Sequence, residues 1–185
     1  MAAEHDKEIA VFGGGCFWCT EAIFKRLKGV YKVLPGYSGG TTENPTYMKV
    51  SEGNTGHAEV IYIEFDPTEV SFKTLLTVFF ASHDPTTLNR QGADVGTQYR
   101  SVVFYTAEAQ RGEVTSFIED INQSSKEGGV VVTEVVPFKA FYEAENYHHD
   151  YYEAHKDAPY CELVIQPKLE KVQKAFALLL KKEGI

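Results

Sequence analysis

A strand, a glycine-rich turn and a helix are predicted in direct succession near the start of the chain, and this arrangement restricts the fold more than any other feature. An apolar run at residues 9–12 precedes Gly13-Gly14-Gly15, and an amphipathic run follows at residues 20–28. A short apolar run bounded by glycine indicates a strand, whereas helical periodicity indicates a helix. Cys16 therefore lies at the N-terminus of the first predicted helix, where free N–H groups and the helix dipole favour a thiolate.

Two large aromatic residues follow this thiol. They are Phe17 and Trp18, the only tryptophan of the chain, and Cys19 comes next. A nucleophilic sulfur beside an aromatic wall indicates a site for an apolar group that carries a reactive centre. Two simpler interpretations stay open on this segment alone. Either Cys16 is a small, inert core residue, or Cys16 and Cys19 form half of a metal site.

The composition favours one domain with reactive thiols. The chain has 185 residues, 43% of them hydrophobic, which is enough for one well-packed core and short for two. The net charge of −8 argues against nucleic acid and anionic membrane surfaces as partners. No apolar run approaches the roughly 20 residues of a membrane span, and the polar start lacks the apolar core of a signal peptide. We therefore expect a cytoplasmic protein, in which three cysteines fit reactive thiols better than structural disulfides.

Strands and helices are predicted without strict alternation, which indicates an α+β fold, a two-layer sandwich around a mixed sheet. We expect a single domain over residues 1–185, with residues 1–7 disordered and residues 162–185 forming a C-terminal helical tail. The predicted strands are residues 8–12, 31–37, 57–65, 101–105 and 130–135. The predicted helices are residues 17–28, 71–83, 107–124, 144–155 and 167–182.

Two polar loops, residues 38–56 and 83–100, are longer than a connection needs, and long loops in compact domains are usually functional. Tyr47 lies in the first loop, and Asp94 and Tyr99 lie in the second. Tyrosine hydroxyls can position an oxygen-bearing substrate. Neither loop is specific by itself, because the chain has 11 tyrosines and most of them are expected to be packing residues.

Glu59 is a candidate proton donor. In the predicted strand at residues 57–65, alternation places Glu59 on the same face as the apolar Ile61, Ile63 and Phe65. A carboxyl group on an apolar face either has a partner or has a raised pKa, and a raised pKa makes it a proton donor near neutral pH. The alternative is that this end of the strand is solvated and Glu59 is an ordinary surface residue.

Histidines near the C-terminus are a weaker candidate for a site. His148, His149, Asp150 and His155 resemble a metal-binding set, but no cysteine pair or second histidine pair lies near them in the sequence. We therefore expect no metal. No glycine-rich nucleotide-binding pattern is present, so we expect no cofactor.

Several short motifs occur in a fixed order between residues 9 and 161. In this order the chain resembles the peptide-methionine (S)-S-oxide reductases, the A-type methionine sulfoxide reductases. That resemblance implies an α+β sandwich with a ferredoxin-like core around a mixed sheet. The motifs are Gly15-Cys16-Phe17-Trp18, Gly36-Tyr37-Ser38-Gly39-Gly40, Asn44-Pro45-Thr46-Tyr47, Thr55-Gly56-His57-Ala58-Glu59, His83-Asp84-Pro85 and Gly96-Thr97-Gln98-Tyr99-Arg100-Ser101.

The resemblance also implies roles for individual residues. Cys16 matches the nucleophile, which attacks the sulfoxide sulfur and becomes a sulfenic acid while methionine leaves. Glu59 matches the acid that protonates the sulfoxide oxygen. Phe17 and Trp18 match the aromatic residues that hold the methyl group of the sulfoxide. Tyr47 and Tyr99 match residues whose hydroxyl groups bond to the sulfoxide oxygen or to an associated water. Asp94 matches a residue that helps to hold a polar substrate group or water.

The resolving cysteine is not settled by the resemblance. Cys161 matches the family's usual resolving position, but the glycine-rich stretch with a further cysteine that often follows is missing, and Cys19 stands where the family often has glycine. We favour Cys161 over Cys19. Thioredoxin or another dithiol is the implied reductant, and we expect a monomer that acts on free or protein-bound methionine sulfoxide.

Two other function classes fit part of the sequence. A general thiol-disulfide oxidoreductase explains Cys16 and Cys19 but leaves Glu59 and both loops without a role. A non-catalytic peptide-binding module with an aromatic cage around Trp18 leaves Cys16 unexplained.

Overall fold

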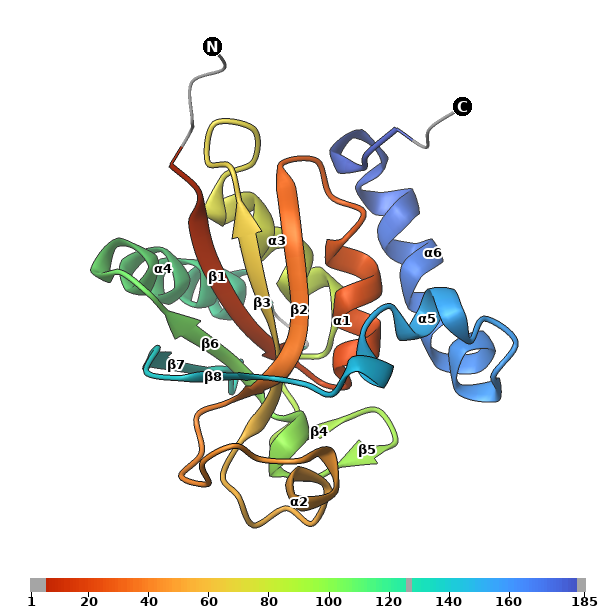
Figure 1. The fold of residues 1–185 in the computed structure, drawn as a ribbon. Helices are drawn as coiled ribbons and strands as arrows, with labels where there is room; N and C mark the ends of the chain where they lie inside the picture. Colours follow the sequence, from red (N-terminus) through yellow and green to blue (C-terminus); the bar gives the residue numbers. More distant parts are fainter. Residues whose placement is uncertain (1–5, 126–127, 183–185) are drawn as a thin grey trace.

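A computed structural model describes residues 6–125 and 128–182, and its centre is a six-stranded sheet in the order β7-β6-β1-β3-β2-β8 (Figure 1). Most of the segment expected to be disordered, residues 1–7, lies outside the described residues. A separate two-stranded ribbon pairs β4 with β5. The strands are β1 (Glu8–Gly14), β2 (Val30–Ser38), β3 (Ala58–Phe65), β4 (Arg90–Gln91), β5 (Asp94–Val95), β6 (Ser101–Tyr105), β7 (Glu134–Pro137) and β8 (Phe141–Glu143).

The six-stranded sheet is mixed, as expected from the sequence. The strand β3 pairs with β1 and β2, and β1 pairs with β6, all antiparallel. At one edge β8 pairs with β2 in the antiparallel sense, and at the other edge β7 pairs with β6 in parallel. The prediction of a mixed sheet packed with helices is therefore confirmed.

Most residues of the central strand β3 are buried on either face, and most of them are apolar. Ile61 and Ile63 lie in the core cluster that contains Phe24 and Phe79 from the helices. Val60, on the opposite face, lies in a second cluster against which Phe141 packs. Helices therefore cover one face, and the segment around β7 and β8 covers part of the other.

Two of the helices begin at polar caps. Ser71 caps α3 by accepting a hydrogen bond from Thr74 N at 3.0 Å, and Thr46 caps α2 by accepting one from Lys49 N at 3.3 Å. Such caps satisfy N–H groups that the helix itself leaves unpaired. The helices are α1 (Phe17–Phe24), α2 (Tyr47–Ser51), α3 (Phe72–Ser82), α4 (Glu108–Ser124), α5 (Tyr151–Ala154) and α6 (Gln166–Ala175).

Several predicted elements have different bounds in the structure. The predicted helix at residues 144–155 is wrong, because a 3₁₀ turn (Asn146–His148) and the short α5 replace it. Asp150 separates them with φ +52°, in the left-handed region that a helix does not tolerate. The predicted strand at residues 130–135 begins only at Glu134, as β7, and β8 was not predicted. The helix predicted to end at residue 28 ends at Phe24.

The C-terminal segment is docked along α1. A π-helical turn (Cys161–Ile165) leads into α6, which lies beside α1 (Figure 1), and a 3₁₀ turn (Ala177–Leu179) follows, so the helix predicted for residues 167–182 ends at Ala175. The backbone then forms a bridge, with Lys28 N donating to Leu179 O at 2.8 Å and Lys181 N donating to Arg26 O at 2.7 Å. The segment is therefore fixed to the end of α1.

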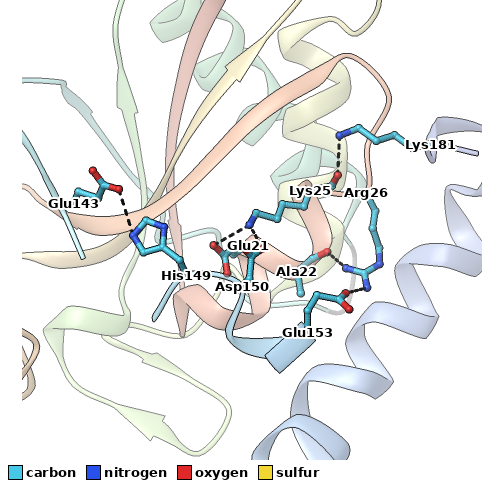
Figure 2. A network of polar contacts seen from close by, with 9 residues as sticks. All are labelled: Glu21, Ala22, Lys25, Arg26, Glu143, His149, Asp150, Glu153 and Lys181. Atoms are coloured by element: carbon cyan, nitrogen blue, oxygen red, sulfur yellow. Dashed lines mark hydrogen bonds and ion pairs between the residues drawn. The ribbon is translucent and has the colours of Figure 1, made fainter. Parts of the chain in front are cut away.

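Ion pairs also hold α5 against the end of α1 (Figure 2). Lys25 pairs with Asp150 and, at 3.4 Å, with the buried Glu21, while Arg26 pairs with Glu153 at 2.5 Å. Burial raises the pKa of Glu21, and the nearby Lys25 opposes this shift. Within residues 6–125 and 128–182, no helix is long and apolar enough to cross a membrane.

Candidate active site

A strained glycine turn delivers Cys16 to the start of α1. Gly15 has φ +91°, and a Cβ there would lie 2.7 Å from Gln91 Cγ, so only glycine fits without movement. Cys16 is the N-cap, with extended backbone, and its carbonyl accepts a hydrogen bond from Cys19 N at 3.1 Å. The nucleophile predicted from the sequence therefore stands where β1 passes into α1.

The pKa of Cys16 differs from the sequence expectation. The thiol is 9% exposed. Burial raises its pKa well above the ordinary value, and the hydrogen bond with Cys19 and the charge of Glu59 act in the same direction; only the Trp18 N–H opposes them. The prediction that the helix start favours a thiolate at Cys16 is wrong, because desolvation outweighs the helix terminus.

Glu59 lies buried against the same helix start. Its side chain is 2% exposed, and Oε1 accepts a hydrogen bond from Phe17 N, the first N–H of α1, at 3.2 Å. Burial raises the pKa of Glu59 to about 8, the Phe17 N–H lowers it in part, and the charge of Asp94 raises it further. Of the two interpretations of Glu59, the buried one holds, and the carboxyl group is protonated at neutral pH.

Two tyrosines, one from each of the two long loops, lie near enough to this carboxyl group to feel its charge. Tyr47 starts α2, and Tyr99 ends a 3₁₀ turn (Thr97–Tyr99). Burial raises the pKa of both hydroxyls, and the charges of Glu59 and Cys16 raise it further. Both tyrosines are therefore neutral hydrogen-bond donors near Glu59.

Asp94 is connected to the thiols through Tyr160, a residue that the sequence patterns did not indicate as part of the site. Asp94 Oδ2 accepts a hydrogen bond from the Tyr160 hydroxyl at 2.8 Å. The same hydroxyl lies 3.9 Å from Cys19 Sγ. Tyr160 thus links the second long loop to the thiols.

Aromatic rings form a wall beside Cys16. Phe17 is fully buried, with its ring centroid 5.7 Å from that of Tyr37. The Trp18 ring is partly exposed and stacks on Tyr151, with centroids 3.7 Å apart and an interplanar angle of 6°. Stacking of this kind holds the indole in one plane.

All three thiols lie together. Cys16, Cys19 and Cys161 are free and buried in one apolar cluster with Ala22 and Ile165. Cys161 is the first residue of the π-helical turn and is fully buried. Both resolving candidates therefore stand in the same cluster as Cys16.

The chain matches known proteins over almost its whole length. The model of the family "Peptide methionine sulfoxide reductase" matches residues 8–179.

The chain belongs to the peptide methionine sulfoxide reductase family.

Its relatives include the peptide methionine sulfoxide reductases MsrA of Sulfolobus acidocaldarius, 57% identical over 91% of this chain and 95% of that protein, and of Saccharolobus solfataricus, 56% identical over 91% and 94%. Among solved structures, Mxr1 from Saccharomyces cerevisiae in its reduced form has a TM-score of 0.77 and 31% identity, and the match covers 85% of this chain and 92% of that one. The chain is thus an oxidoreductase that reduces methionine sulfoxide.

Three residues of this reductase site were missed or set aside at the sequence level. Glu145 accepts hydrogen bonds from the Tyr37 hydroxyl at 3.0 Å and from Tyr47 N at 3.0 Å. Tyr160 contacts Asp94, and His148 accepts a hydrogen bond from Trp18. Only Tyr160 carried a signal, because it directly precedes Cys161.

The histidine segment does not form the metal set considered for it. His148 and His155 do not share a helix face, because Asp150 interrupts the segment. In the part of the chain that the structure describes, no group of three or more His, Cys, Asp or Glu side chains is arranged to hold a metal ion.

Proposed function

We propose that this reductase acts on the S epimer of methionine sulfoxide, free or in proteins, with Cys16 as nucleophile and Glu59 as general acid. The observation that carries the proposal is the buried Glu59, whose pKa of about 8 keeps it protonated at neutral pH next to the N-cap thiol. A sulfoxide oxygen is a poor leaving group until it is protonated, so a neutral carboxylic acid beside a sulfur nucleophile supplies what the reaction lacks.

The chemical step needs no reactant other than the sulfoxide, the Cys16 thiol and the Glu59 carboxylic acid. Cys16 Sγ bonds to the substrate sulfur, and Glu59 gives its proton to the sulfoxide oxygen. The thiol proton released by Cys16 restores the carboxylic acid. The S–O bond then breaks and the oxygen bonds to Cys16 Sγ, which becomes a sulfenic acid. The bond between the two sulfur atoms breaks in the same exchange, and methionine leaves with both of its electrons.

Substrate orientation is assigned to the surrounding side chains. Tyr47 and Tyr99, which are neutral, donate to the sulfoxide oxygen, and Asp94 holds Tyr160 at the rim. Phe17 and Trp18 hold the methyl group. With the methyl group and the oxygen directed to opposite sides, only one epimer presents its sulfur to Cys16.

We further propose that Cys161 resolves the sulfenic acid. Its thiolate attacks Cys16 Sγ, water leaves, and a Cys16–Cys161 disulfide remains. Its burial in the same cluster as Cys16 supports this assignment, because the docked tail already holds it there. Cys19 is the rival, since its hydrogen bond with Cys16 lowers its pKa and so increases its thiolate fraction.

An external dithiol of the thioredoxin type is the proposed reductant. A solved structure with the same fold is that of yeast Mxr1 "in complex with Trx2", and the thioredoxin-type exchange step reduces disulfides of this kind. A general thiol-disulfide oxidoreductase function is not favoured, because it gives no role to Glu59.

Four broader assignments accompany this proposal. The order of β1, α1, β2, β3, α3 and β6 along the chain, and the antiparallel sheet order β6-β1-β3-β2, support a ferredoxin-like core. We assign residues 1–185 to one catalytic domain. All proposed residues come from one chain, which supports a monomer, and three free thiols suit the reducing cytoplasm.

The test uses peptides that contain one separated epimer of methionine sulfoxide. With dithiothreitol as reductant, we expect methionine from the S epimer at a rate about 5- to 150-fold above that from the R epimer, because a misplaced oxygen leaves buried polar groups unpaired at a cost of about 1–3 kcal/mol. Cys16→Ser serves as the matched inactive control. Equal rates for the two epimers would contradict the proposed orientation.

A further inference from the structure

His148 lies under the aromatic wall and has no role in the steps above. It ends the 3₁₀ turn Asn146–His148 and is 0% exposed. Its Nδ1 accepts a hydrogen bond from Trp18 Nε1 at 3.0 Å. Because indole nitrogen only donates, the bond requires a neutral imidazole with its proton on Nε2.

Aromatic rings surround the imidazole. The ring centroids of Tyr147, Tyr47 and Phe17 lie 4.1, 4.5 and 5.0 Å from that of His148. Its Nε2 is buried and finds no hydrogen-bond partner among residues 6–125 and 128–182. The one conventional hydrogen bond of this side chain is therefore the one to Trp18, and the rings fix its orientation.

We propose that neutral His148 is a positioning residue that holds the Trp18 indole in place for the methyl group of methionine sulfoxide. This inference rests on the proposed role of Trp18 in binding that group. Trp18 has Tyr151 stacked on one face, so stacking fixes the plane of the indole while the bond to His148 fixes its rotation within that plane. The residues that His148 contacts, Trp18, Phe17 and Tyr47, are those proposed to orient the substrate, so its effect falls on substrate binding.

The groups around His148 set the pH range in which it is neutral. Burial lowers its pKa below the ordinary 6.5, the charge of Glu145 opposes this, and His149 lowers the pKa further. Burial keeps Tyr47 and Tyr147 neutral by raising their pKa values. Above the pKa of His148 the bond to Trp18 is intact. Below it, a proton on Nδ1 faces the indole N–H, and the bond is lost.

The first measurement uses the fact that Trp18 is the only tryptophan of the chain, so a ¹H–¹⁵N spectrum contains a single indole N–H signal. We expect this signal to move with pH in the parent, with a midpoint below 6.5. His148→Asn offers an acceptor oxygen near the position of Nδ1 and does not titrate, so its signal should stay close to that of the neutral parent at every pH. His148→Leu should shift the signal to that of an unbonded indole.

The second measurement is steady-state reduction of a methionine sulfoxide peptide at pH 7.5. His148→Leu leaves the indole N–H without its acceptor, so we expect KM to rise about tenfold while kcat changes less than about twofold. His148→Asn should restore KM to within about threefold of the parent. In the parent, KM should rise as the pH falls below the midpoint of the indole titration, and in His148→Asn this rise should be absent.

Two results would overturn the inference. One is an indole signal that His148→Leu leaves unchanged, and the other is a KM that stays at the parent value while the signal moves. Circular dichroism of both variants confirms that they are folded. Loss of sulfoxide reduction in the parent itself would refute the proposed function, which keeps the two failures separate.

Discussion

Replacing Glu59 by glutamine should make the protein more stable and much less active. Glutamine is close in shape to glutamic acid and keeps an oxygen that can accept the hydrogen bond from Phe17 N, which lies 3.2 Å from Glu59 Oε1. The variant therefore removes the ionisable proton and little else. The proton has opposite consequences for folding and for catalysis, and both can be worked out from its pKa.

The stability effect follows from the difference between the folded pKa of about 8 and the ordinary value of 4.5. As pH rises above 4.5, the unfolded chain releases this proton while the folded chain keeps it, so the stability of the parent falls until about pH 8. Each pH unit in this interval costs about 1.4 kcal/mol. At pH 7 the expected loss is about 3 kcal/mol, and Glu59→Gln should recover it.

The catalytic effect has the other sign. Loss of a general acid typically slows the chemical step by about 10²–10⁴. The parent should also lose activity as the pH rises through about 8, because the ionised Glu59 cannot donate a proton. The assay is single-turnover formation of methionine without added reductant, which isolates the chemical step from recycling.

Denaturant unfolding at pH 5, 7 and 9 provides the matching stability measurement. The difference in unfolding free energy between Glu59→Gln and parent isolates this one group, because all other titrating residues are common to both proteins. The expected difference grows by about 1.4 kcal/mol per pH unit between pH 5 and 8 and then levels off. A difference that is constant with pH, or a single-turnover rate within threefold of the parent, would refute the reasoning.

Further substitutions test the rest of the site. Cys16→Ser should abolish sulfoxide reduction with every reductant, and activity above about a tenth of the parent in a methionine-release assay would exclude Cys16 as the nucleophile. Cys161→Ser should release about one methionine per enzyme and then stall with thioredoxin, whereas Cys19→Ser should turn over repeatedly. Mass spectrometry of the disulfide-linked peptides identifies the cysteine that is joined to Cys16. The reverse pattern would show that Cys19 is the resolving cysteine. Gly15→Ala should destabilise the fold by more than about 1 kcal/mol in denaturant unfolding, because φ is +91° and the new Cβ meets Gln91. The control Gly112→Ala, in open space on α4, should stabilise it by about 0.5–1 kcal/mol, and equal effects of the two changes would contradict the strain at Gly15.

Sequence patterns predicted the features of the fold and site that depend on residues close together in the chain. Alternation along the β3 sequence placed Glu59 on the side of Ile61, and the structure buries it there against α1. Similarly, the glycine turn before Cys16 predicted the strand-to-helix junction. Both follow from backbone periodicity and from the conformations that glycine permits.

Contacts between distant parts of the chain could not be predicted in this way. The hydrogen bonds that hold Tyr47, Asp94 and Trp18 come from Glu145, Tyr160 and His148, between 66 and 130 residues away in sequence. The helix predicted at residues 144–155 failed for a related reason, because tertiary contacts hold Asp150 at φ +52°. The Cys16 pKa was misjudged because burial by the C-terminal segment is a property of the folded chain alone.

The enclosure of α1 has a consequence for how the molecule fluctuates. The helix has eight residues, of which Trp18 is the only one not buried, and the sheet, α6 and the bridge at Leu27 and Leu180 hold it from several sides. An isolated helix of this length would be marginal in water. Here its amides should exchange with deuterated solvent only when the whole chain unfolds, whereas the loops that carry Tyr47 and Tyr99 should exchange sooner. The nucleophile would then be the stationary part of the site, and the hydroxyl groups would be the parts that adjust to each oxidised methionine.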